Sequence, residues 1–563
     1  MKPAVLFFTL SLFVATGLPR FFALDSHWSS DETLWLNRSA HFISAVKQRE
    51  FSETLITHHP GVITMWLAGL RTFFIEPRVD IENLSHARWF ISIVVWIGLG
   101  IACLLIYQLF GGWVALVSSA SLAYSPFFLA QARRVHTDAL ATTFILLTML
   151  LFFLYCQNRP RQGYLILSGI TFGVALMSKS YSLILLPWIP LGLFIFREKC
   201  ARNFWAGIAE GLCFLNCTAL TVLALWPVFW IPIFGFIAFC LLGFTWVLFR
   251  GMKKEDCPTE FIVAAAVALG LVSVMTIRTA WRFFEGVHWA IRTPHEVDHF
   301  FLGKVVNDPG WLFYPFVLLV KSTPLLLPLA LFACVSLWKK RKCSDMADGH
   351  FRSALGIGLG IVLFTVCLSG TSKKLSRYLL PVFPMLEILA AISFVEGFKW
   401  SSTMLCSRFG MAETAKGKTF LAILAWVGFF SIQIVPVLSC HPYYGTYYNL
   451  CWKEANITKI ITVGETAGLD LTAKYLNQKH NAHQLKVAVS PLGTRFVQHY
   501  FVGFTYNTRK KYLPADYEVV YIRDSQIGKV PQTGTRNGVL EHTIAVNGID
   551  LAWIYRIRDK ETP

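Results

Sequence analysis

Charged residues are scarce in this chain of 563 residues: they make up 15% of it, against 55% hydrophobic residues. The mean hydropathy is +0.52. Soluble proteins of this length carry much more charge, so the composition excludes that class. The sequence predicts a polytopic, all-α membrane protein.

Metal and redox spacings are also missing, because none of the 13 cysteines forms a C-x-x-C pair. Most cysteines fall within apolar segments as small fillers. The sequence leaves open whether Cys440 and Cys451 in the tail form a disulfide. The net charge of +18 requires no nucleic-acid partner, since much of it lies in short loops that would contact anionic membrane lipids.

Long apolar segments are abundant instead. A membrane-spanning helix needs about 20 mostly apolar residues, and we count about thirteen such segments. The first follows Lys2, and we interpret it as a retained helix rather than a signal peptide because Pro19 and Arg20 suit an interfacial helix end. The segments lie near 4–23, 89–109, 112–130, 139–156, 164–178, 181–196, 203–225, 231–249, 259–280, 311–337, 353–370, 378–396 and 419–437.

The distribution of Lys and Arg sets the orientation. With a cytoplasmic N-terminus, the connections that face the cytoplasm are basic: "QNRPRQG", "REKCAR", "RGMKKED", "KKRKCSD" and the loop with Lys399, Arg408, Lys416 and Lys418. Segments 24–88 and 281–310 and the tail then lie outside. We therefore predict a transmembrane domain over 1–437 and an extracytoplasmic domain over 438–563, in the plasma or inner membrane.

Two acids, Asp31 and Glu32, directly follow the first apolar segment. They open "DETLWLNRSAHFISAV", which has the apolar stripe of a helix lying in the membrane interface: Leu34, Trp35, Phe42, Ile43 and Val46. The segment "HHPGVITMWLAGLRTFF" predicts a second interfacial helix. Two explanations stay open for the acids. They favour a helix N-terminus capped by Ser29 or Ser30, or they are a carboxylate pair held in place for catalysis.

A second polar group lies at an outer membrane boundary, where Asp138 follows Arg133, Arg134 and His136 in "ARRVHTDALATTF". It is either a paired polar site or a helix cap. Basic side chains also gather at an outer boundary in "SGTSKKLSRYLLPVFP", against the positive-inside trend. Its Lys373, Lys374 and Arg377 are candidates for binding a phosphate at headgroup level, and the alternative is snorkelling of helix-end bases.

The loop 281–310 is rich in His, acids and Trp. Its candidate metal ligands match no closed zinc spacing, and its tryptophans equally suit a surface that faces carbohydrate or headgroups, so we weight metal low. These candidates are His288, His295, Glu296, Asp298 and His299. In the tail, "GLDLTAKYLNQK" predicts a helix, and "LKVAVS", "YEVVYIR" and "LAWIYRIR" predict strands of a small α/β domain that shapes acceptor entry or only covers the bundle.

Together these motifs resemble the GT-C fold glycosyltransferases, and more closely the dolichyl-phosphate-mannose protein mannosyltransferases and the bacterial aminoarabinose transferases of lipid A. The segments "THHPGVITMWLAGL", "HTDALATTF", "FLGKVVNDPGWLFYPFVLLVKSTPL" and "HPYYGTYYN" occur in the order of that family. The resemblance implies an inverting transfer of a sugar from a polyprenyl-phosphate carrier to a protein, lipid or glycan acceptor at the outer face.

The same resemblance implies residue roles: Asp31 as catalytic base, Glu32 as its neighbour and Asp138 as the second acid. Lys373, Lys374 and Arg377, with Arg133 or Arg134 in reserve, would stabilise the departing carrier phosphate. Where the aminoarabinose enzymes place an acid and a lysine before a proline pair, this chain has His58 and His59. The resemblance therefore leaves two questions open: whether these two histidines contact a substrate, and whether the protein uses a divalent metal. The tail lacks the repeated modules of eukaryotic protein mannosyltransferases.

Two other classes compete with the enzyme. A transporter or a lipid-linked sugar flippase also needs many spans, but it concentrates polar groups near the midplane and often has two related halves, whereas here the ionisable groups cluster at one face without an internal repeat. A non-catalytic scaffold would leave Asp31 and Asp138 with capping alone. The enzyme is the favoured interpretation.

Overall fold

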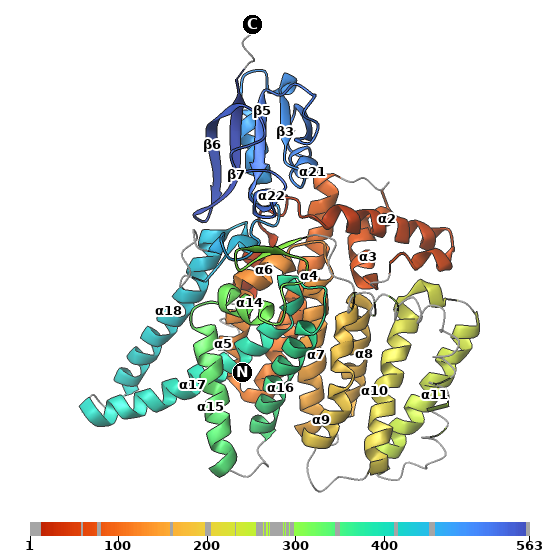
Figure 1. Ribbon diagram of the computed structural model, residues 1–563. Helices are drawn as coiled ribbons and strands as arrows, with labels where there is room; N and C mark the ends of the chain where they lie inside the picture. Colours follow the sequence, from red (N-terminus) through yellow and green to blue (C-terminus); the bar gives the residue numbers. More distant parts are fainter. Residues whose placement is uncertain are drawn as a thin grey trace.

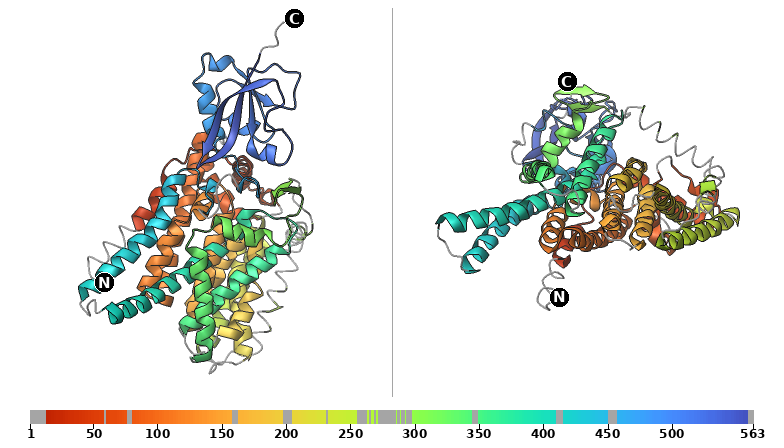
Figure 2. Two further views of the ribbon diagram at one scale, coloured as in Figure 1. Left: turned by 60° about the vertical axis from the view of Figure 1, so that its left-hand side comes forward. Right: turned by 90° about the horizontal axis from the view of Figure 1, so that it is seen from below.

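The computed structural model describes residues 13–57, 60–75, 80–157, 162–196, 204–230, 232–254, 298–343, 349–409, 415–449 and 457–558, with single residues at 263, 266, 267, 270, 285, 288 and 292. A helical bundle forms the lower part of the molecule, and a sheet domain made by the tail lies on one end of it (Figures 1 and 2). The coarse fold prediction, a mostly helical membrane protein, is confirmed.

The bundle consists of long apolar helices. They are α4 (Ile81–Phe110), α5 (Gly112–Ala123), α6 (Pro126–Ala132), α7 (Asp138–Gln157), α8 (Gly163–Ser178), α9 (Trp188–Phe196), α10 (Phe204–Leu225), α11 (Pro232–Lys254), α14 (Phe313–Lys321), α15 (Leu326–Cys343), α16 (Gly349–Ser369), α17 (Val382–Phe409) and α18 (Ala415–Cys440). α7 lies at the centre of the bundle, and 94% of the most apolar 18-residue stretch of this helix is buried. By contrast α4 exposes Ile97, Ile101 and Leu104, spaced as one helix face, as expected of a side that meets lipid.

Four of the described helices are long and apolar enough to cross a membrane, or up to six if each bent pair is one span. The prediction of about thirteen spans is therefore not confirmed, and part of it, including most of 259–280, falls outside the described residues. Two predicted spans are bent where a proline interrupts the helix: α5 and α6 meet at 64° before Pro126, and α14 and α15 at 114° around Pro324. The first bend turns the chain toward the segment 133–138.

The first loop forms α2 (Glu32–Lys47) and α3 (Val62–Gly69), which lie across one end of the bundle beside the sheet domain (Figure 1). Both predicted helices are present. α2 buries Trp35, Phe42 and Ile43, whereas Leu34, which we had placed on the apolar stripe, is 47% exposed. Gly61 precedes α3 with φ +56°, and a Cβ there would lie 2.2 Å from the Trp35 ring. Glycine thus meets both a backbone and a packing requirement.

The tail forms a five-stranded mixed sheet in the order β4-β3-β5-β7-β6. β3 (Lys486–Val489) pairs in parallel with β4 (Phe504–Asn507) and β5 (Tyr517–Tyr521), while β7 (Ile549–Ile557) runs antiparallel to β5 and to β6 (Gly538–Val546). The predicted helix is α20 (Leu469–Asn477), and the three predicted strands are β3, β5 and β7. β4 and β6 were not predicted, because β4 is only half-buried and β6 is largely exposed along its length.

A hydrogen bond and a ring stack join the sheet domain to the first loop of the bundle. Thr466 donates a hydrogen bond to the carbonyl of Trp28 at 2.7 Å, and the Trp28 ring stacks on His499 at 4.0 Å between centroids. On the other side, a small hairpin of β1 (His299–Phe301) and β2 (Lys304–Val306) is joined to the tail through Phe300 and Thr462. The carboxyl ends of β3 and β5 therefore face the bundle.

Candidate active site

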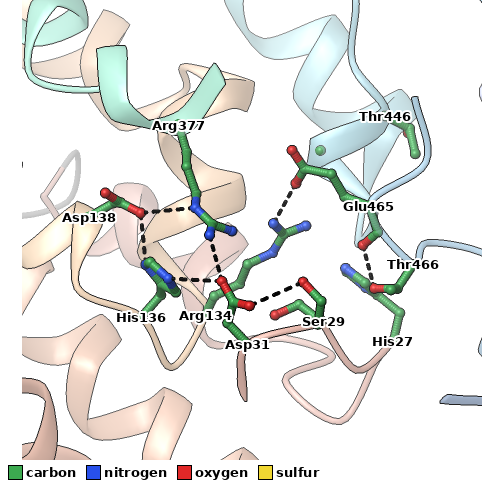
Figure 3. Close-up of polar contacts among 12 residues, drawn as sticks. His27, Ser29, Asp31, Arg134, His136, Asp138, Arg377, Thr446, Glu465 and Thr466 are labelled. Carbon is green, nitrogen blue, oxygen red and sulfur yellow. Dashed lines mark hydrogen bonds and ion pairs between the residues drawn. The ribbon is translucent and has the colours of Figure 1, made fainter. Parts of the chain in front are cut away.

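Asp31 is the N-cap residue of α2, but its side chain makes no capping hydrogen bond. Its Oδ2 instead accepts from Nη2 of Arg377 at 2.5 Å and lies 3.3 Å from Nε2 of His136 (Figure 3). The predicted helix start is present, with Glu32 in the first turn, but the N-cap residue is Asp31 rather than Ser29 or Ser30, and the Asp31 side chain is used in the ion pair instead of a cap. The carboxylate keeps 30% exposure, so it is fixed in place and still open to a ligand.

The electrostatics of Asp31 favour its charged form. Burial opposes ionisation, but the Arg377 guanidinium and the hydrogen bond from His136 outweigh it and hold the pKa of Asp31 below its usual value. The group is consequently a carboxylate at neutral pH.

Asp138 begins α7 and is completely buried. Its Oδ1 lies 2.5 Å from Nζ of Lys179, and its Oδ2 lies 2.7 Å from Nδ1 of His136 and 3.4 Å from Nε of Arg377. His136 therefore lies between two carboxylates, with one ring nitrogen toward each.

Glu32 is turned away from the cavity and is also completely buried. It receives two hydrogen bonds from Arg88, at 2.7 and 2.5 Å, and one from each of the backbone N–H groups of Ser29 and Val135, at 2.9 Å. Burial alone would raise the pKa of Glu32, but the Arg88 cation and these hydrogen bonds outweigh burial. The pKa of Glu32 is therefore below its usual value. Glu32 thus joins the loop that carries Asp31 to the segment that carries His136 and Asp138.

The predicted phosphate-binding residues occupy different places. Arg377 joins the two catalytic candidates, whereas Lys374 is buried and lies 2.7 Å from Asp308, and Lys373 is half-buried beside it. Arg134 pairs with Glu465 at 2.6 Å. Arg133 donates to the carbonyls of residues 22, 23 and 442, a structural role.

A cavity of about 430 Å³ opens beside Asp31. One wall contains Asp31, Arg134 and Arg377, and a second comes from the tail. Glu465 of the tail also lines the cavity, and its pKa is lowered to about 2: burial opposes this, and the cations of Arg134 and Lys321 cause it. The cavity is thus bordered by carboxylates and guanidinium groups at the end of the bundle.

The residues present do not fit a metal between the two acids, because Arg377 and His136 fill that position with positive or donor groups. Within the described ranges, no group of three His, Cys, Asp or Glu side chains could hold an ion. His288 is exposed, while His58, His59, His295 and Glu296, together with Cys451 of the open disulfide, lie outside the described residues.

Lys179, Arg88 and Glu465 belong to the site but were not predicted, and His136 was noted only as a neighbour of Asp138. Lys179 had a usable signal: it is a basic residue at an outer helix end, like Arg377. Burial lowers the pKa of Lys179 to about 8, against the attraction of Asp138. Arg88 and Glu465 carried no such signal, because their partners lie 56 and 331 positions away in the sequence.

The structure has a helical membrane bundle with a cluster of ionised side chains at one end, and a tail domain completes a cavity beside that cluster. These features define a membrane protein with an enzyme-like site. Residues 80–226 match the sequence model of the family described as dolichyl-phosphate-mannose-protein mannosyltransferase. The matched range contains Arg88, His136, Asp138 and Lys179. The resemblance to this glycosyltransferase family is confirmed, and with the candidate spans it supports a membrane glycosyltransferase.

Solved structures were also compared with the chain. ArnT from Cupriavidus metallidurans bound to undecaprenyl phosphate is similar at 15% identity, with 98% of each chain covered and a TM-score of 0.45. The oligosaccharyltransferase of Archaeoglobus fulgidus tethered with an acceptor peptide is similar at 12% identity, with 92% of this chain and 70% of that one covered and a TM-score of 0.46. No curated protein sequence matches the chain.

Proposed function

We propose that this protein transfers a sugar from a polyprenyl-phosphate carrier to a hydroxyl group of a protein, lipid or glycan acceptor at the outer face of the membrane. The observation that carries the proposal is the position of Asp31: an ionised, partly open carboxylate at the wall of a cavity, fixed by Arg377 and His136. The family match over residues 80–226 supports the class of donor, since that family is named for a polyprenyl-phosphate sugar.

Asp31 is the general base in this reaction. The acceptor hydroxyl attacks the anomeric carbon and gives its proton to Asp31, while the bond from that carbon to the phosphate oxygen breaks and its electron pair leaves with the carrier phosphate. A new glycosidic bond forms on the opposite face, so the anomeric centre is inverted. No covalent sugar–enzyme intermediate is required.

Arg377 stabilises the phosphate as it departs. Negative charge grows on the leaving oxygen, so a cation placed there stabilises the transition state more than the ground state. Arg377 is held between Asp31 and Asp138, close to the attacked carbon, and Lys373 and Lys374 lie three to four positions before it on the same segment. These two lysines would extend the phosphate site toward the membrane surface.

Asp138 and Glu32 position the reacting groups. Asp138 orients His136 and, with Lys179, fixes the charge balance of the site, and Glu32 ties the Asp31 loop to Val135. The basic loops support a cytoplasmic N-terminus, with the site and the tail on the extracytoplasmic side. The transmembrane enzyme domain would then span 1–437 and the accessory domain 438–563.

The experiment compares Asp31→Asn with the parent protein in cells that otherwise lack it. Asparagine keeps the volume but cannot accept a proton at neutral pH, so transfer should fall by roughly 10²- to 10⁴-fold. Mass spectrometry should then show lipid-linked sugar accumulating and one surface glycan disappearing. The matched control is Asp80→Asn, because Asp80 caps α4 through the N–H of Asn83 and Asn caps about as well. Normal glycans with Asp31→Asn would refute the assignment.

A further inference from the structure

The tail domain contributes one whole wall of the cavity. Pro491 and Leu492 follow β3, and Arg523, Asp524 and Lys529 follow β5. β3 and β5 are parallel neighbours, and ligands of sheets with parallel strands bind beyond the carboxyl ends of those strands. The tail wall is therefore placed where this kind of fold recognises ligands.

The cations on the two walls differ in their pairing. On the bundle wall, Arg134 and Arg377 are each paired with a carboxylate, at 2.6 and 2.5 Å. On the tail wall, Arg523 and Lys529 form no ion pair with any acid in the described part of the chain. The Nε of Arg523 is buried without a hydrogen-bond partner there. Two positive side chains thus border the cavity without a bound counter-charge.

The nearby acid does not neutralise them by contact. Asp524 is 1% exposed, and its Oδ2 accepts the backbone N–H of Leu492 at 2.9 Å, which joins the loops after β3 and β5. Burial raises the pKa of Asp524, against that hydrogen bond and the neighbouring cations. Its role is to hold the two loops together, so the cations beside it stay directed to a ligand.

The donor would not use this wall. A polyprenyl carrier keeps its chain in the bilayer, so its phosphate approaches from the bundle side, which contributes Arg377 to the cavity. The tail wall faces the second substrate. We propose that Arg523 and Lys529 form a subsite for an anionic group of the acceptor, a phosphate or a carboxylate, which directs a neighbouring hydroxyl toward Asp31. This inference rests on the function proposed above and names the chemical class of its acceptor.

The test measures binding and needs no transfer. Glycerol 3-phosphate, which carries hydroxyls beside a phosphate, is titrated into the purified full-length protein in detergent, and binding is followed as a shift of thermal unfolding. Glycerol serves as the uncharged probe. Arg523→Gln and Lys529→Gln should each weaken binding by about tenfold or more, the effect of losing one charge-assisted hydrogen bond. Lys511→Gln, an exposed residue of the same domain outside the cavity, makes the same charge change and should bind like the parent.

Three outcomes would overturn the subsite: no binding of glycerol 3-phosphate to the parent, equal binding of glycerol, or unchanged binding in the Arg523→Gln/Lys529→Gln double variant. A loss of binding in Arg377→Gln, without a loss in the double variant, would place the phosphate at the donor site and also refute the inference. The proposed function fails separately. If Asp31→Asn keeps transfer while the tail variants lose the probe, the subsite stands and the base assignment falls.

Discussion

Nη2 of Arg377 lies 2.5 Å from Oδ2 of Asp31, although 346 positions separate the two residues in the sequence. The same guanidinium places its Nε 3.4 Å from Asp138. One cation therefore contacts both Asp31 at the cavity and the buried Asp138 behind it. In the proposed reaction a carrier phosphate would compete with Asp31 for this guanidinium, and release from Arg377 would make Asp31 a stronger base.

This ion pair predicts the acid limb of the pH profile. The pKa of Asp31 is lowered, so its carboxylate stays ionised as the pH falls to 3.8, the usual pKa of an aspartate side chain. Activity should therefore be lost only below that pH. Arg377→Gln removes the attraction while burial remains, so the pKa of Asp31 rises and the acid limb moves to higher pH. The measurement is kcat/KM for the lipid donor against pH in reconstituted vesicles. An acid limb that stays in place in Arg377→Gln would exclude Asp31 as its source.

Glu32 and Arg88 predict a strong non-additive effect on stability. Arg88→Met leaves Glu32 buried without its partner, which should lower the free energy of unfolding by about 3–5 kcal/mol. The Glu32→Gln/Arg88→Met double variant removes both charges and should recover part of that loss. Unfolding in detergent, followed by circular dichroism, measures the coupling. Additive losses would contradict a direct buried pair.

Gly61 and Gly111 separate two costs of adding a methyl group. Both have positive φ, but a Cβ at Gly61 would lie 2.2 Å from Trp35, while a Cβ at Gly111 meets nothing within 4 Å. Gly111 has ψ 172°, a backbone region that is almost closed to residues with a Cβ, so Gly111→Ala should cost about 1–3 kcal/mol from the backbone alone. Gly61 lies in the left-handed helical region, where alanine costs about 1–2 kcal/mol, so any larger loss in Gly61→Ala comes from the Trp35 ring, and Trp35→Ala in the same chain should relieve it. A loss in Gly61→Ala that Trp35→Ala does not relieve, measured by thermal unfolding, would argue against close packing of α2 on α3.

Topology is the most direct of these predictions. A tag at the C-terminus should be labelled from outside an intact cell, and a tag in "KKRKCSD" should be labelled only after permeabilisation. Labelling of the second tag in intact cells would reverse the orientation and the proposal of chemistry at the outer face.

Local sequence patterns were sufficient for many of the elements and insufficient for the pairings. The apolar runs, the interfacial helices and the strands β3, β5 and β7 follow from periodicity, because side chains that face lipid or a core repeat at the period of the element. Asp31, Asp138 and Arg377 could be proposed because an ionisable group at a membrane boundary is expensive and stands out.

The rest depends on which distant residues meet. Glu32 and Asp31 are adjacent in sequence, yet only the fold separates them into a buried bridge to Arg88 and an open carboxylate. Similarly, nothing in "GETAGLD" indicates that Glu465 reaches Arg134, or that the loop after β5 reaches the same cavity as Ser29. Sequence spacing carries no information about such contacts, because they are set by the docking of the tail.

The placement of the cavity between the first and the last folded parts of the chain has a consequence for biogenesis. Asp31 is made early in synthesis, but the wall after β5 forms only when residues 517–529 and their partner β7 have been made. The chain from the first loop to β7 must therefore be complete before the two parts of the lining can enclose a ligand. A nascent chain that stops before β5 presents Asp31 and Arg377 without the part of the lining that the tail supplies.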